Sequence, residues 1–267
     1  MTLLAILVGT LVAGIGSVWL AAWLSFGVLS RYTQHMLSLA AGALLATAFL
    51  HLLPEAFESE AGAHELFLTL LIGLLFFFLL DKAELWHHGH EHGHGHHHHH
   101  QAHDHGHPHA HHAEEKFGGQ WAVLAGDSVH CFGDGILIAS AFMADMRLGV
   151  IAALAVLAHE VPHHMGDLAV LRQGSSSRKA AIVKVSMAGA ITAFGGAVGY
   201  VLVDALHDWL PFFLVVASSS FVYVALADLI PQLQKRLSAR ETASQILWLA
   251  VGMGMVLVVS TLAGHQH

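Results

Sequence analysis

Charged residues are scarce in this sequence. They make up 11% of its 267 residues, whereas 55% are hydrophobic. Ordinary soluble domains contain about 25% charged and about 45–50% apolar residues. The imbalance indicates that lipid surrounds much of the chain. The sequence also lacks a basic face with interleaved aromatic residues, which argues against nucleic acid as a partner.

Cysteine is almost missing as well. Cys131 is the only one, so no intrachain disulfide can form and nothing in the cysteine count indicates an oxidising compartment. The charged n-region of a cleavable signal peptide is also missing, because the first basic residue is Arg31. We therefore expect the first apolar segment to remain as a membrane span.

Long apolar stretches, by contrast, are abundant. A helix that crosses a hydrocarbon core of about 30 Å needs about 20 mostly apolar residues, and eight stretches meet this requirement. We predict an all-α polytopic bundle that forms one transmembrane domain over residues 1–267. Its eight helices are expected at Leu3–Leu24, His35–Phe57, Leu66–Trp86, Gln120–Ala144, Gly149–Leu171, Ala180–Val203, Pro211–Leu233 and Gln245–Ala263.

Basic residues indicate how these spans are oriented. Ten of the eleven Lys and Arg residues mark the connections that follow odd-numbered spans, and only Arg147 lies elsewhere. The positive-inside rule assigns such connections to the cytoplasm, so both termini are expected to face outward. Without a recognisable targeting signal, we expect a bacterial inner (plasma) membrane.

Histidines gather between the third and fourth spans. Of the 26 histidines, 16 lie within residues 87–112, in low-complexity sequence that cannot pack a core. We expect residues 87–119 to form a cytoplasmic His-rich loop that contacts metal, because clustered imidazoles bind zinc, copper and nickel. An inert solvated linker is the alternative.

The fourth span contains ionisable residues that are costly inside a membrane and therefore indicate function. Asp127, His130 and Asp134 follow one another at spacings of three and four, which places them on one helical face. Cys131 lies next to that face.

The fifth span repeats this arrangement. His159, His163 and Asp167 are four residues apart on one face, with Glu160 and His164 about 100° around the helix. Pro162 should bend this helix near the polar residues, since it removes a backbone hydrogen bond.

Two facing helices with imidazole and carboxylate groups can surround a divalent cation at about 2 Å per ligand. The alternative is a hydrogen-bonded polar network that only holds the helices together. In the second span, His51 and Glu55 form a further pair near the expected outward end. They are either part of a pathway mouth or an ordinary solvated helix end.

Several motifs together resemble those of the ZIP family of zinc and iron transporters, particularly its LIV-1-like branch. They are HLLPEA in the second span, HCFGDG in the fourth, HEVPHHMGD in the fifth and FVYVALADLIPQ in the seventh, with the His-rich loop after the third. The resemblance covers nearly the whole chain.

The resemblance implies a metal site between the fourth and fifth spans, ion movement toward the cytoplasm and frequent homodimers. It implies a first metal position at His130, Asp134, His159 and His163, and a second to which Cys131 and Glu160 contribute. Zn²⁺ is the expected transported substrate, and Fe²⁺, Mn²⁺, Co²⁺, Ni²⁺ and Cd²⁺ accept overlapping ligands. The chain departs from the family pattern with Cys131 in place of asparagine and His164 in place of a frequent glutamate. A thiolate would favour softer metals.

Three other functions compete with transport. The string from His159 to His163 fits HExxH, the zinc motif of metalloproteases, although Pro162 within it would distort the helical turn. A cation-diffusion exporter would use a His-x-x-x-Asp pair such as His130 and Asp134. Such an exporter, however, is expected to have six spans and a soluble C-terminal domain. A metal-storage protein would leave the buried ligands without a purpose. We therefore predict a divalent metal-ion transporter, with no enzymatic activity.

Overall fold

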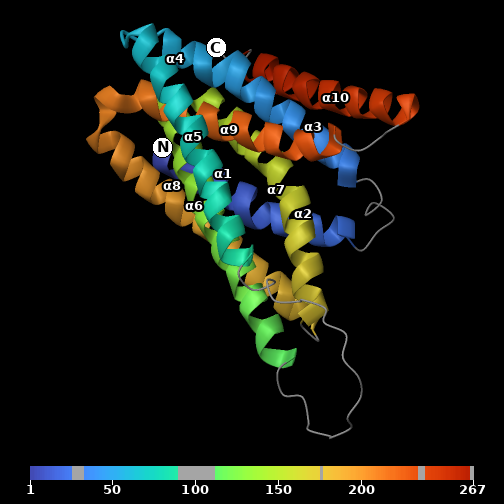
Figure 1. The fold of residues 1–267 in the computed structure, drawn as a ribbon. Helices are drawn as coiled ribbons and strands as arrows, with labels where there is room; N and C mark the ends of the chain where they lie inside the picture. The colour runs from blue at the N-terminus through green and yellow to red at the C-terminus, as the bar shows by residue number, and fades with distance from the viewer. Residues whose placement is uncertain (26–32, 90–111, 175–176, 234–237, 265–267) are drawn as a thin grey trace, which may run out of the picture.

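The computed structural model describes residues 1–25, 33–89, 112–174, 177–233 and 238–264. These residues form helices joined by short connections, with no strand among them, which confirms the all-α class. Figure 1 shows the helices packed side by side as an elongated bundle. The elements in chain order are α1 (Thr2–Leu11), η1 (Val12–Gly16), α2 (Ser17–Ser25), α3 (Thr33–Thr47), η3 (Ala48–Leu52), α4 (Leu53–Phe57), α5 (Ala63–Gly89), α6 (His112–Ala144), α7 (Met146–Gly174), α8 (Arg178–Ala205), η4 (His207–Trp209), α9 (Leu210–Leu233) and α10 (Ala239–Gly264).

Seven stretches of the described chain are long and apolar enough to cross a membrane. They correspond to seven of the eight predicted spans. The remaining one, Gln120–Ala144, lies within the continuous helix α6 but is not among the seven. Polar residues such as Asp127, His130 and Asp134 lower the apolar character of this helix.

The first two spans are not uniform α-helices. Each contains one π-helical turn: η1 joins α1 to α2, and η3 joins α3 to α4. Such turns are rare in proteins, and those that occur are often found at functional sites. The apolar pattern of the chain predicted these spans but carried no signal for the π turns.

The connection between α5 and α6 is shorter than predicted. Residues 87–89 continue α5 and residues 112–119 begin α6, so both ends of the expected loop are helical. A helix satisfies its own backbone hydrogen bonds and can therefore extend beyond its apolar stretch. Residues 90–111, with most of the His-rich sequence, lie outside the described residues.

The helix α6 packs against α7 and α8, and α3 packs against α10. Close approach depends on glycine at several crossings. A Cβ at Gly135 would overlap the carbonyl oxygen of Thr192 in α8, and a Cβ at Gly14 would overlap that of Gly189. Small residues of this kind let membrane helices approach closely.

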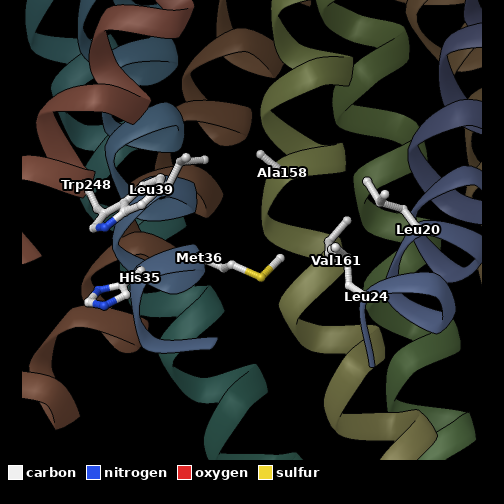
Figure 2. Close-up of a pocket in the computed structure, with 8 residues that line it drawn as sticks. All are labelled: Leu20, Leu24, His35, Met36, Leu39, Ala158, Val161 and Trp248. Atoms are coloured by element: carbon white, nitrogen blue, oxygen red, sulfur yellow. The ribbon is translucent and has the colours of Figure 1, made fainter. Parts of the chain in front are cut away.

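The helix α7 has two contrasting faces. Ala158 and Val161 line an apolar cavity of about 480 Å³ between α2, α3, α7 and α10 (Figure 2). His159 and Glu160, between them in sequence, are buried on the side that faces α6. The helix stays helical through Pro162, and the bend expected there remains a prediction.

Candidate metal centre

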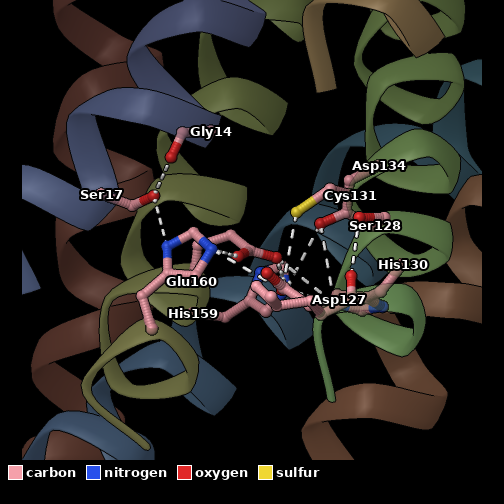
Figure 3. A network of polar contacts seen from close by, with 11 residues as sticks. Gly14, Ser17, Asp127, Ser128, His130, Cys131, Asp134, His159 and Glu160 are labelled. Carbon is pink, nitrogen blue, oxygen red and sulfur yellow. Dashed lines mark hydrogen bonds and ion pairs between the residues drawn. The ribbon is translucent and has the colours of Figure 1, made fainter. Parts of the chain in front are cut away.

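Polar side chains of α6 and α7 meet in the interior of the bundle and form two groups of metal-binding type (Figure 3). Within each group, one ligand atom per residue lies within 4.8 Å of all the others. The first group comprises His130, Asp134, His159 and Glu160, and the second comprises Asp127, Cys131, Glu160 and His164.

The geometry of the first group fits one small cation. The Nε2 atoms of His130 and His159 are 3.2 Å apart, and each lies 3.3 Å from Oε1 of Glu160. Oδ2 of Asp134 is 3.4 Å from Nε2 of His159 and 3.9 Å from that of His130. Ligands bound tetrahedrally at about 2.0–2.1 Å are about 3.3 Å from one another. The separations among His130, His159 and Glu160, and that between His159 and Asp134, are therefore close to the spacing of a tetrahedral coordination shell.

The second group contains the only thiol of the chain. Nε2 of His164 lies 3.1 Å from Oε2 of Glu160 and 3.7 Å from Oδ1 of Asp127. The Cys131 thiol is 3.7 Å from the same Asp127 oxygen. This group combines sulfur, nitrogen and oxygen ligands, whereas the first offers nitrogen and oxygen alone.

Glu160 links the two groups through its two carboxylate oxygens. Oε1 faces the imidazoles of the first group, and Oε2 faces His164 in the second. The side chain is 1% exposed, and neither oxygen has a hydrogen-bond partner. Buried carboxylate oxygens without partners are costly, and a cation on each side would compensate them.

Other buried atoms of the cluster also lack hydrogen bonds. Oδ2 of Asp134, Oδ2 of Asp127 and Nε2 of His164 have no hydrogen-bond partner. A network that only held the helices together would be expected to satisfy such atoms internally. Buried atoms that lie close to other polar atoms without a hydrogen bond therefore favour a site that receives ions.

His163 lies beside the first group but belongs to neither group. Its ring centroid is 5.7 Å from those of His130 and His159, and its side chain is exposed. The family resemblance implied that His163 shares the first metal position with His159, whereas the first group of the structure contains Glu160 and not His163. The other five predicted site residues, His130, Cys131, Asp134, His159 and Glu160, all lie within the two groups.

Asp127 and His164 were not among the predicted site residues, yet both belong to the second group. Their sequence signal was present, because Asp127 precedes Cys131 by four residues and His164 follows Glu160 by four. The pair His51 and Glu55 lies in η3 and α4 and joins neither group. Its role at a pathway mouth remains a prediction.

A residue of the first span supports the second group. Oγ of Ser17, at the start of α2, lies 2.9 Å from Nδ1 of His164. The same hydroxyl donates a hydrogen bond of 2.6 Å to the carbonyl oxygen of Gly14. No pattern in the sequence indicates the contact with His164, which joins residues 147 positions apart.

Comparisons with known proteins agree with this chemistry. A family model described as ZIP Zinc transporter matches residues 1–116 and 83–260. Zinc transporter ZIP10 of Danio rerio is 35% identical over 153 residues, which cover 54% of this chain and 18% of that protein. Zinc transporter ZIP4 of Mus musculus is 33% identical over 136 residues, 51% of this chain and 20% of that protein.

A third relative aligns over most of both chains. Zinc transporter ZIP13 of Pongo abelii is 27% identical over 276 residues, which cover 95% of this chain and 77% of that protein. Against ZIP10 and ZIP4, in contrast, the aligned region spans only about a fifth of the relative's length.

Proposed function

Because this chain belongs to the ZIP zinc transporter family, in its LIV-1-like branch, we propose that it carries zinc ions across a membrane. The chain is an integral membrane protein with apolar helices long enough to span a bilayer. The family consists of transporters, so no enzymatic activity is assigned. The proposal extends to the transport site, the ion and the direction of movement.

The transport site in this proposal is the cluster between α6 and α7. The observation that supports it most strongly is Glu160, whose two buried oxygens form no hydrogen bond and each face a different group of ligands. Each group would hold one ion, with the carboxylate of Glu160 shared between them. Sharing one carboxylate also lowers the repulsion between two cations held close together.

Access to the cluster is uneven, which suits a site that loads and releases ions. His159 and Asp134 are almost fully buried, whereas the side chain of His130 is 29% exposed and His163 is more exposed still. We assign His163 the role of an accessory ligand that passes the ion to or from the first group. Release requires the site to open alternately to the two sides of the membrane.

The direction is expected to be toward the cytoplasm, as the resemblance to the family implies. We also expect outward termini, a cytoplasmic His-rich sequence, a bacterial inner membrane and a homodimer. They depend on the distribution of basic residues and on the family resemblance.

The protease alternative has little support. In an HExxH site both histidines bind one zinc ion while the glutamate activates water. Here Oε1 of Glu160 lies 3.3 Å from Nε2 of both His130 and His159, in the place of a further ligand. His163, the second histidine of the motif, lies outside the group. The comparisons also name zinc transporters.

Zinc influx into liposomes tests the proposal. The purified chain is reconstituted in vesicles that contain a zinc-sensitive dye, and the parent is compared with His159→Ala and with a deletion of residues 90–111. We expect influx for the parent, none for His159→Ala and most of the parental rate for the deletion. If the parent transports no divalent ion, the proposal fails. Competition by Fe²⁺, Mn²⁺, Co²⁺, Ni²⁺ and Cd²⁺ ranks the ions that share the pathway.

A further inference from the structure

Both nitrogens of the His164 imidazole lie close to polar atoms of other residues. Nδ1 lies 2.9 Å from the Ser17 hydroxyl, and Nε2 faces the oxygens of Glu160 and Asp127. Both His164 and Ser17 are 0% exposed. Water is therefore not an alternative partner for either side chain, and their protons must be distributed among these atoms.

The short bond to Gly14 determines where the serine proton lies. The carbonyl oxygen of Gly14 can only accept a hydrogen bond, and it is 2.6 Å from Oγ of Ser17. Two oxygens this close need a proton between them, and only the serine can supply it. Since the hydroxyl has a single proton, its oxygen must accept from His164, and Nδ1 must be the donor.

This assignment determines the chemistry of the other ring nitrogen. In a neutral imidazole that carries its proton on Nδ1, Nε2 has a free lone pair. Nε2 lies 3.1 Å from Oε2 of Glu160, and neither atom has a hydrogen-bond partner. With the ring neutral, two lone-pair atoms at this separation repel each other, and a metal ion bound to both at about 2 Å would remove that repulsion.

The backbone around Ser17 holds the hydroxyl in place. Gly14 lies in the π turn η1, and a Cβ at this position would overlap the carbonyl oxygen of Gly189 in α8. The carbonyl that orients Ser17 is therefore fixed by close packing of the first span against α8. The bond to Gly14 is enough to satisfy the Ser17 hydroxyl as a donor within its own helix. The additional contact with His164 therefore indicates a further role for this hydroxyl.

We propose that Ser17 is a positioning residue for the second group: its hydroxyl oxygen accepts the Nδ1 proton of His164 and directs the Nε2 lone pair at the metal position formed with Asp127, Cys131 and Glu160. The inference rests on the proposed function, because it requires that the second group binds an ion. Metal-binding histidines commonly donate their second ring N–H to such an acceptor, and loss of the acceptor lowers metal affinity by about 10–100-fold.

Cobalt titration of the full-length protein in detergent tests this proposal. A thiolate bound to Co²⁺ produces a ligand-to-metal charge-transfer band, and Cys131 is the only cysteine of the chain. The band therefore reports on the second group alone, whatever cobalt the His-rich sequence binds. Parent, Ser17→Ala and Ser17→Thr are titrated, with Cys131→Ser as the blank.

A matched serine provides the control for general effects on packing. Ser218 in α9 is also 0% exposed and bonds to the carbonyl oxygen of Leu214 at 2.9 Å. It belongs to neither group of the metal cluster. Ser218→Ala should therefore leave the cobalt titration unchanged.

We expect Ser17→Ala to need about 10–100-fold more cobalt than the parent for half of the band. Ser17→Thr, which keeps the hydroxyl, should stay within about threefold of the parent. Equal titrations of the parent and Ser17→Ala would overturn the proposal, as would a threonine variant as weak as the alanine variant, because the effect would then come from packing. If the parent itself gives no band while zinc influx is intact, the second group binds no cobalt and Ser17 positions nothing, although the transport proposal survives.

Discussion

Replacement of Glu160 by glutamine tests whether one carboxylate serves both groups of the metal centre. Glutamine has the same size, but it carries one oxygen and one NH₂ group in place of two anionic oxygens. In the structure Oε1 of Glu160 is 3.3 Å from Nε2 of His159, and Oε2 is 3.1 Å from Nε2 of His164. The amide oxygen can face only one of these histidines.

The size of the effect can be worked out from this geometry. The group that faces the NH₂ loses a ligand outright, because an amide nitrogen has no lone pair to offer. The other group keeps an oxygen but loses its negative charge. Loss of a residue that only supports a ligand costs about 10–100-fold in metal affinity, so loss of a ligand should cost at least about 100-fold, or about 2.7 kcal/mol.

Single-group variants provide the comparison. Asp134→Asn removes a charge from the first group alone, and Asp127→Asn removes one from the second alone. The assays are zinc influx into dye-loaded liposomes and the cobalt–thiolate titration. Asp127→Asn should weaken the titration, Asp134→Asn should leave it within about threefold of the parent, and Glu160→Gln should both weaken it and abolish influx.

A bridging role for Glu160 is refuted by either of two results. If Glu160→Gln transports zinc like the parent, the carboxylate is not a ligand of the transported ion. If it reduces influx but leaves the cobalt–thiolate titration unchanged, the residue serves the first group only. The expression level and the elution profile of each variant in detergent establish that it is folded.

Three further predictions concern stability, each measured as the thermal unfolding midpoint in detergent. Gly135→Ala should destabilise the protein by about 1–3 kcal/mol, since the added Cβ would overlap α8. Gly133→Ala should be neutral or stabilising, because no atom lies within 4 Å of its Cβ. Equal midpoints for the two variants would contradict the close packing of α6 against α8. Asp145→Ala should cost about 1 kcal/mol, because Oδ1 accepts hydrogen bonds from two backbone N–H groups at the start of α7, and Asp145→Asn should retain most of that stability. Ser238→Ala should cost about 1 kcal/mol, because Ser238 and Glu241 bond reciprocally at the start of α10; an unchanged midpoint would mean that this end of the helix frays in the native state.

Much of the helical framework could be predicted from the pattern of hydropathy along the chain. A bilayer requires long apolar helices, so the spans from Leu3 to Leu24 and from Gln245 to Ala263 are expected from hydropathy, and the structure has helices there. The π turns η1 and η3 could not be predicted. They depend on how each span packs against its neighbours, and hydropathy carries no such information.

The sequence by itself also determined which helices hold the polar residues, because spacings of three and four place side chains on one face. It could not determine which side chains of α6 and α7 share one position. That depends on the rotation and distance of the two helices, which tertiary packing sets, and for that reason Glu160 faces His130 while His163 stands aside. The contact of Ser17 with His164 is likewise a product of the fold, since close packing between residues far apart in the chain brings the first span against α7.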